Sequence, residues 1–137
     1  MAVCETVRGV RLRASCTLAA ADRVLRSEGR LEESIEACRG TGVLRQHCVS
    51  HIVHTRSDAW VDAGYAVAME SVGLVISSTH GVDSMDSLGQ QVGLLAARLG
   101  APMDEGPCEY FRDGIAYASC RTRQYDTLSH AGGNTTP

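Results

Sequence analysis

The chain contains no lysine and few aromatic residues. All 13 basic residues are arginine, and the aromatic side chains are one tryptophan, one phenylalanine and four tyrosines. The core therefore has to be built from Leu, Val, Ile, Ala and Met, and because such a core has few large anchors, covalent cross-links would add to its stability. The net charge of −3 argues against general nucleic-acid binding, which needs clustered positive charge.

Several functional signatures are also missing. No G-x-G-x-x-G sequence or P-loop occurs, so we expect no phosphate cradle. No Cys-x-x-Cys pair occurs, so zinc ribbons, thioredoxin-type redox sites and c-type haem attachment lack their motif. Arg8, Arg11 and Arg13 interrupt the apolar stretch that a signal peptide needs. Residues 63–79 are shorter than the roughly 20 apolar residues that cross a bilayer, so we expect a buried core helix there.

Helical spacing of apolar residues predicts an all-α fold of disulfide-stapled helical hairpins with about five helices. The expected helices cover residues 4–28, 30–39, 43–69, 84–99 and 107–121. The two glycines of 40–42 predict a turn. Gly100 follows the last residue of an expected helix, where a glycine in the left-handed backbone conformation commonly ends the helix. Residues 71–82 are either a helix end or a short extended piece. We expect a single helical domain over residues 1–123 and a flexible polar tail over 124–137.

The six cysteines form three spaced pairs and are the strongest signal in the sequence. The pairs are Cys4 with Cys16, Cys38 with Cys48, and Cys108 with Cys120. Six cysteines in this arrangement favour three disulfides, and disulfides indicate an oxidising compartment.

The spacing limits how these disulfides can close. Ten or twelve residues of straight helix span about 15–18 Å, whereas the Cα atoms of a disulfide lie within about 7 Å. No pair can therefore close within one continuous helix. The glycines at 40 and 42 favour a local Cys38–Cys48 bond across a turn, and Gly9 and Gly114 are weaker candidates for helix breaks in the other pairs. The alternative joins Cys16 to Cys38 and Cys4 to Cys48 between antiparallel helices.

Paired cysteines on helices resemble the coiled-coil-helix–coiled-coil-helix proteins of the mitochondrial intermembrane space. The segment Cys38-Arg-Gly-Thr-Gly-Val-Leu-Arg-Gln-His-Cys48 has the nine-residue spacing of that family, and Cys108-Glu-Tyr-Phe resembles a cysteine helix of its small respiratory-chain subunits. The other two pairs enclose eleven residues. The resemblance covers the cysteine helices only. It implies a protein that is imported without a cleaved presequence and is oxidised in the intermembrane space.

His47, His51 and His54 are candidates for metal ligands. Their i, i+4, i+7 spacing places them on one stripe of a helix, and histidines at i and i+4 are a known ligand pair. The same helix turns Cys48 and Ile52 away from that stripe, so we expect the histidines on the polar side. Because no carboxylate follows at a neighbouring helical position, we expect no metal, no cofactor and no catalytic residue.

These patterns predict a non-catalytic structural or accessory subunit of a larger assembly, and the resemblance implies that this assembly is a mitochondrial respiratory-chain complex. Its partners would be other protein subunits, with a place peripheral to a membrane complex and no nucleic acid. One alternative is a free-standing exported or periplasmic disulfide-rich helical binding module. The other is a metal-binding protein that uses the histidines and cysteines. The intermembrane space is the favoured compartment, with the bacterial periplasm or secretion as alternatives.

Overall fold

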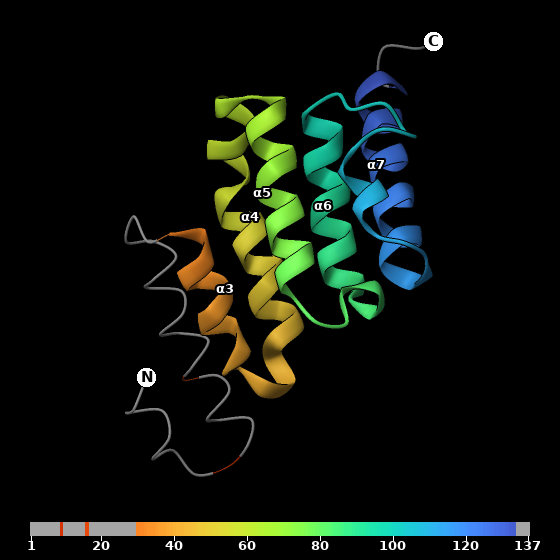
Figure 1. Cartoon of the computed structure of the whole chain (residues 1–137). Coiled ribbons are helices and arrows are strands. Elements are labelled where there is room, and N and C mark those ends of the chain that lie inside the picture. The colour runs from red at the N-terminus through yellow and green to blue at the C-terminus, as the bar shows by residue number, and fades with distance from the viewer. Residues whose placement is uncertain (1–8, 10–15, 17–29, 134–137) are drawn as a thin grey trace. The chain divides into compact units, whose positions relative to one another are not determined.

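The computed structural model describes residues 9, 16 and 30–133. Every regular element in this part of the chain is a helix, which confirms the all-α prediction (Figure 1). The expected helix over 4–28 lies outside the described residues, except that Cys16 is helical and Gly9 has a positive φ of 89°. The chain divides into two compact units, Met1–Thr55 and Arg56–Pro137.

The first unit contains α3 (Leu31–Arg39), the 3-10 turn η1 (Gly42–Leu44) and the beginning of α4 (Arg45–Ala63). Acidic residues occupy the first turn of α3 and Arg39 its last turn, an order that complements the helix dipole. Ser34, Ile35 and Cys38 are buried along one face. The helix expected over 30–39 is confirmed.

The turn between α3 and η1 is formed by Gly40, Thr41 and Gly42. The Gly40 N–H donates to the Ala37 carbonyl at 3.3 Å. Thr41 is fully buried, and its hydroxyl donates to the Cys38 carbonyl. Gly42 has a φ of 56°, in the left-handed region that glycine tolerates best. The expected turn at 40–42 is therefore confirmed.

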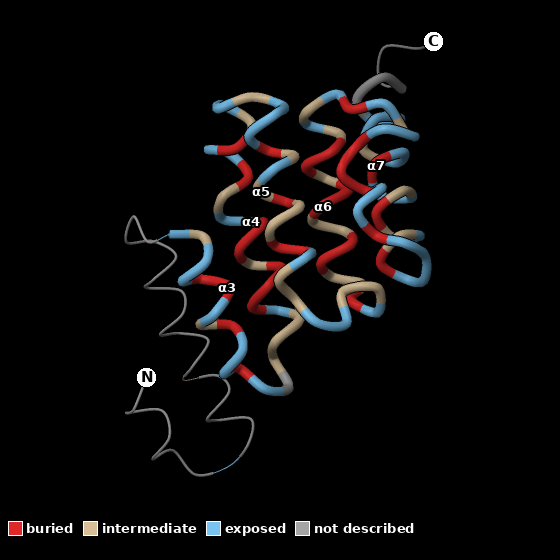
Figure 2. The backbone as a smooth tube through the Cα atoms, viewed as in Figure 1, coloured by how far each residue is buried: buried red, intermediate tan, exposed pale blue. Residues whose placement is uncertain are grey.

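The helix expected over 43–69 is divided in two at Gly64. This residue has a φ of 111° and separates α4 from α5 (Tyr65–Ser78). α5 continues through most of the ambiguous segment and ends before Thr79, whose backbone is extended. Val72 and Val75 of α5 are fully buried. Figure 2 shows buried stretches of backbone, in red, along α5. None of the helices among the described residues is long and apolar enough to span a membrane.

The helix α6 (Asp86–Arg98) follows the 3-10 turn η2 (Val82–Ser84). Its buried face contains Leu88, Val92 and Leu95, as the apolar stripe predicts. At its end, Gly100 has a φ of 66°, its N–H donates to the Ala97 carbonyl, and the Ala101 N–H donates to the Ala96 carbonyl. These two bonds form a Schellman end, which confirms the role expected of Gly100.

The last part of the chain differs from the prediction. Residues expected as one helix over 107–121 form the 3-10 turn η3 (Pro107–Tyr110) and the beginning of α7 (Gly114–Gly133). α7 then continues through most of the segment that we expected to be a flexible tail, and Gln124 is fully buried. The polar composition of this segment misled the prediction, because most of residues 124–130 lie on the exposed side of a helix. Residues 134–137 lie outside the described residues.

α6 and α7 run side by side at very close range (Figure 1). A Cβ atom on Gly89 would lie 2.9 Å from the Ala116 Cα atom and closer still to its carbonyl oxygen. A Cβ atom on Gly93 would lie 2.9 Å from the Arg123 Cβ atom and would clash with the Cys120 carbonyl. The two glycines are one turn apart, so the backbones of α6 and α7 approach each other without intervening side chains.

Candidate functional site

The first disulfide connects the end of α3 to the first turn of α4. The Cα atoms of Cys38 and Cys48 lie 5.5 Å apart, and the intervening turn brings the two ends together. Both cysteines are buried. The structure thus has the local bond across the glycine turn, and the alternative that joins Cys38 to Cys16 and Cys48 to Cys4 is not the arrangement present.

The second disulfide connects η3 to α7. The Cα atoms of Cys108 and Cys120 lie 5.6 Å apart. The helix break that this bond requires extends from Phe111, whose backbone is extended, to Gly114, whose φ is 89°. The expectation that no cysteine pair closes within a continuous helix is confirmed here as well.

The third disulfide is described at one end only. Cys16 is disulfide-bonded, and Cys4 lies outside the described residues. The disulfides of the described part indicate an oxidising compartment. Cys48, Cys108 and Cys120 have no exposed surface and Cys38 almost none. Because thiol–disulfide exchange requires access for an attacking thiolate, these bonds are structural cross-links rather than exposed redox centres.

Gln124 is a buried polar residue beside the second disulfide. Its Nε2 atom donates to the Ala101 carbonyl at 2.9 Å, and its Oε1 atom lies 3.6 Å from the Cys108 sulfur. A buried amide needs such a partner, because an unpaired polar group in the interior destabilises the fold. Gln124 therefore connects α7 to the segment that follows α6. Sequence reasoning missed this residue because it assigned position 124 to the tail.

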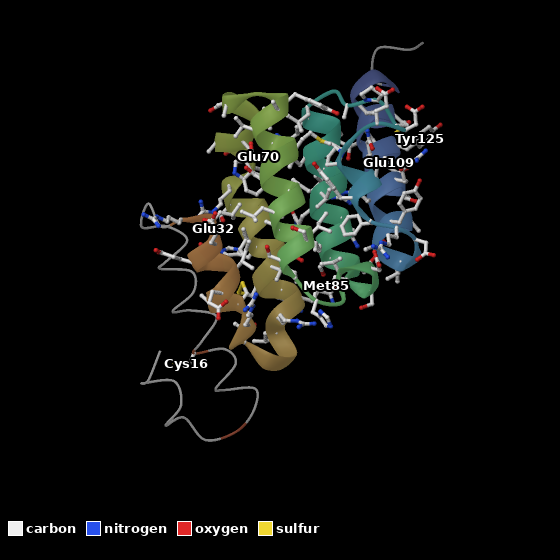
Figure 3. All side chains as sticks on the ribbon, in the orientation of Figure 1. Cys16, Glu32, Glu70, Met85, Glu109 and Tyr125 are labelled. Atoms are coloured by element: carbon white, nitrogen blue, oxygen red, sulfur yellow. A yellow bond between two sulfur atoms is a disulfide. The ribbon has the colours of Figure 1, made fainter. Side chains whose placement is uncertain are left out.

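A surface cluster reinforces the same junction. The Arg121 guanidinium lies 2.9 Å from the Glu109 carboxylate, and it donates to the Tyr117 hydroxyl at 2.7 Å. Glu109 belongs to η3, and the other two residues belong to α7 (Figure 3 labels Glu109). Because exposed ion pairs contribute little, this cluster orients η3 on α7 more than it stabilises the junction.

The histidine stripe lies where the sequence places it. His47 and His54 are exposed and His51 is half-buried, whereas Cys48 and Ile52 of the same helix are buried. The His51 and His54 rings stack with centroids 6.3 Å apart. Within residues 9, 16 and 30–133, no three His, Cys, Asp or Glu side chains are grouped so as to hold a metal ion.

Replacement of all three histidines with alanine is expected to change the free energy of unfolding by no more than about 0.5 kcal/mol, as is usual for surface positions. Chemical denaturation of the triple variant and the parent measures this change. A loss of several kcal/mol, or a stoichiometric metal bound by the parent and lost in the variant, would contradict the prediction.

A small cleft opens where α5, η2 and the η3–α7 linker meet. It has a volume of about 330 Å³, and Ser77, Asp83, Tyr110 and Arg112 are among its lining residues. The Asp83 carboxylate accepts a hydrogen bond from the Arg112 N–H at 3.3 Å, so it positions the linker. The cleft could not be predicted from the sequence, because segments that are far apart in the chain form it.

The four most exposed large apolar side chains of the second unit lie at two places. One is the α4–α5 turn, where Tyr65 and Val67 are each 43% exposed. The other is α7, where Ile115 is 53% and Tyr125 is 62% exposed (Figure 3 labels Tyr125). Tyrosine at such positions is typical of protein-binding surfaces, since it combines an apolar ring with a polar end.

The chain was compared with known proteins. No protein-family model matches it, and no curated protein or solved structure matches it significantly.

Proposed function

We propose that the protein is a non-catalytic accessory subunit of a larger protein assembly. The observation that carries this proposal is the exposure of apolar side chains at the α4–α5 turn and on α7, which a buried disulfide cross-links to η3. Exposed apolar residues that cluster on a rigid framework are typical of surfaces that another protein covers. A stapled framework also loses little conformational entropy when it binds.

The α4–α5 turn supports this proposal. Ala63, Tyr65, Ala66 and Val67 are all exposed around Gly64, and we refer to these four residues as the turn patch. The Tyr65 hydroxyl donates to the Glu105 carbonyl at 3.0 Å, so the loop after α6 restrains the patch. A restrained apolar patch suits contact with a neighbouring subunit.

The assembly that we favour is a mitochondrial respiratory-chain complex, with the protein in the intermembrane space. The support is the oxidising compartment together with the resemblance of the Cys38–Cys48 segment to coiled-coil-helix–coiled-coil-helix proteins. A free-standing exported or periplasmic module is the second candidate. It is supported because each described disulfide lies within one compact unit, so each unit has its own cross-link.

Two-dimensional native and denaturing electrophoresis of material from the source cells tests the proposal. We expect the chain in a complex much heavier than two copies, together with other subunits. The double variant Tyr65→Ser with Val67→Ser should no longer migrate with that complex, because it lacks the two large apolar side chains of the turn patch. Leu128→Ser is the matched control, since Leu128 is 38% exposed but lies outside the patch.

Two results would contradict the proposal. One is a chain that migrates only as one or two copies in native material, which would favour the free-standing module. The other is a double variant that folds, as judged by its circular dichroism and intact mass, and stays in the complex as fully as the Leu128→Ser control does.

A further inference from the structure

The outer side of α7 carries a continuous uncharged stripe. It consists of Ile115, Ala118, Thr122, Tyr125 and Ser129, and we call it the α7 stripe. Positions three or four apart lie on one face of a helix, and all five residues are exposed. Among the large apolar side chains of the described residues, Tyr125 and Ile115 are the most exposed. The residues between Ile115 and Tyr125 on this face are small, so another helix can approach closely.

A hollow between α6 and α7 borders the α7 stripe. It has a volume of about 330 Å³, and it shares Ala118 and Thr122 with the stripe. Its other lining residues are Gln90, Ser119, Arg123 and Asp126. Gln90 donates to the Asp86 carboxylate at 2.8 Å, and the Ser119 hydroxyl donates to the other oxygen of that carboxylate. The Ser119 bond therefore joins α7 to α6 at the hollow, and the Gln90 bond holds the Asp86 carboxylate in place from within α6.

Two exposed charges lie on the hollow's side of the stripe. Arg123 and Asp126 are three residues apart on α7 and share one flank of the helix. The structure gives the Arg123 guanidinium and the Asp126 carboxylate no ion pair, with each other or with any other described residue. When two identical helices pack antiparallel, the same flank of each helix faces its counterpart. The arginine of each copy then lies near the aspartate of the other.

We propose that the α7 stripe binds the α7 stripe of a second copy of this chain, in an antiparallel pair. If the helices cross midway between Arg123 and Gln124, Tyr125 lies opposite Thr122 of the second copy, at the edge of the hollow. Arg123 is then two residues, or about 3 Å along the helix axis, from the level of Asp126 of the second copy. The contact is isologous, since each copy contributes the same tyrosine, the same hollow and both charges.

This inference does not depend on the accessory-subunit proposal. A symmetric pair of chains is compatible with a free-standing module as well as with a subunit. The contact area is limited to one helix face, and a stable interface buries roughly 800 Å² on each partner. We therefore expect a dimer with a dissociation constant between micromolar and millimolar.

Sedimentation equilibrium of the full oxidised chain over this concentration range tests the pair. We expect a reversible monomer–dimer equilibrium. Tyr125→Ala should raise the dissociation constant at least about tenfold, because it removes the largest side chain of the contact. Arg112→Asp is the control, since Arg112 is also an exposed arginine with no ion pair to another described residue but lies outside α7. It should leave the equilibrium unchanged.

Charge-reversal variants then test whether the α7 stripe binds a second copy of the chain in antiparallel orientation. The Arg123→Asp variant has two acidic groups on the flank, and the Asp126→Arg variant has two basic groups. Each should be monomeric alone, because like charges face each other. An equimolar mixture should form a heterodimer at least as tight as the parent dimer, and its formation shows that both variants are folded.

The proposal is overturned if the parent chain remains monomeric up to millimolar concentration. It is equally overturned if a dimer forms but Tyr125→Ala leaves it unchanged, or if the charge variants fail to form the heterodimer. None of these results alters the test of the accessory-subunit proposal, which measures membership of a complex much heavier than two copies.

Discussion

Replacement of Cys108 and Cys120 together with alanine is expected to lower the free energy of unfolding of the Arg56–Pro137 unit by about 3 kcal/mol. The disulfide closes a segment with a sequence separation of 12, and the loop-entropy model assigns roughly this stabilisation to such a closure. Both sulfur atoms are also fully buried, so their loss removes packing next to Gln124. We expect the first turns of α7 to separate from η3 more often than in the parent.

Hydrogen exchange followed by mass spectrometry measures this effect separately in the two units. Protection should fall in η3 and α7 and remain unchanged in α3. The matched control is the double variant Cys38→Ala with Cys48→Ala, which should show the reverse pattern, because its disulfide lies in the other unit. A loss below about 1 kcal/mol, or an equal loss of protection in both units, would show that the second disulfide is not a local cross-link.

Gly89→Ala is expected to destabilise the protein by about 2–3 kcal/mol. The added methyl group would lie within 3.0 Å of the carbonyl carbon of Ala116 and 2.9 Å of its Cα atom, so α6 and α7 must move apart. Forcing extra volume into a close-packed contact typically costs about 1–3 kcal/mol. The gain of up to about 1 kcal/mol from replacing a helical glycine with alanine offsets only part of that cost.

Gly73→Ala is the control for this variant. Gly73 also lies within an α-helix, but the atoms nearest to a methyl group there belong to the end of the exposed Tyr110 side chain, at 3.0 Å. That ring can rotate away, so we expect a change close to zero or a small gain in stability. Thermal and chemical denaturation of both variants measure the difference. Equal stability of the two variants would mean that α6 and α7 are not in backbone contact.

Removal of the second disulfide and the Gly89→Ala substitution both test how α7 is held in the second unit. The glycines allow α6 to approach α7, and the second disulfide anchors the beginning of α7. The outer side of α7 carries the stripe that we assign to a second copy. A variant that separates α6 from α7 would also deform the hollow between them, because Gln90 and Ser119 both bind Asp86. Gly89→Ala should therefore weaken the dimer as well as the fold.

The histidines and Cys48 show what helical periodicity can predict, which is the side of a helix on which a residue lies. The i, i+4, i+7 spacing was sufficient to place His47, His51 and His54 on one stripe and Cys48 and Ile52 on the opposite side. The periodicity did not reveal the break at Gly64, since the sequence on both sides of it is compatible with one long helix. A positive φ at one glycine changes the direction of the chain without changing the apolar pattern.

The sequence by itself determined the helical fold, the turn at 40–42, the left-handed helix end at Gly100 and the rule that cysteine pairs close across helix breaks. These features depend on local geometry, which residue spacing encodes directly. Only the tertiary structure decided that α7 extends to Gly133, that Gln124 is buried, and that Gly89 and Gly93 lie against α7. Each of these depends on contact between segments far apart in the chain. The polarity and spacing of residues within one segment carry no information about which other segment packs against it.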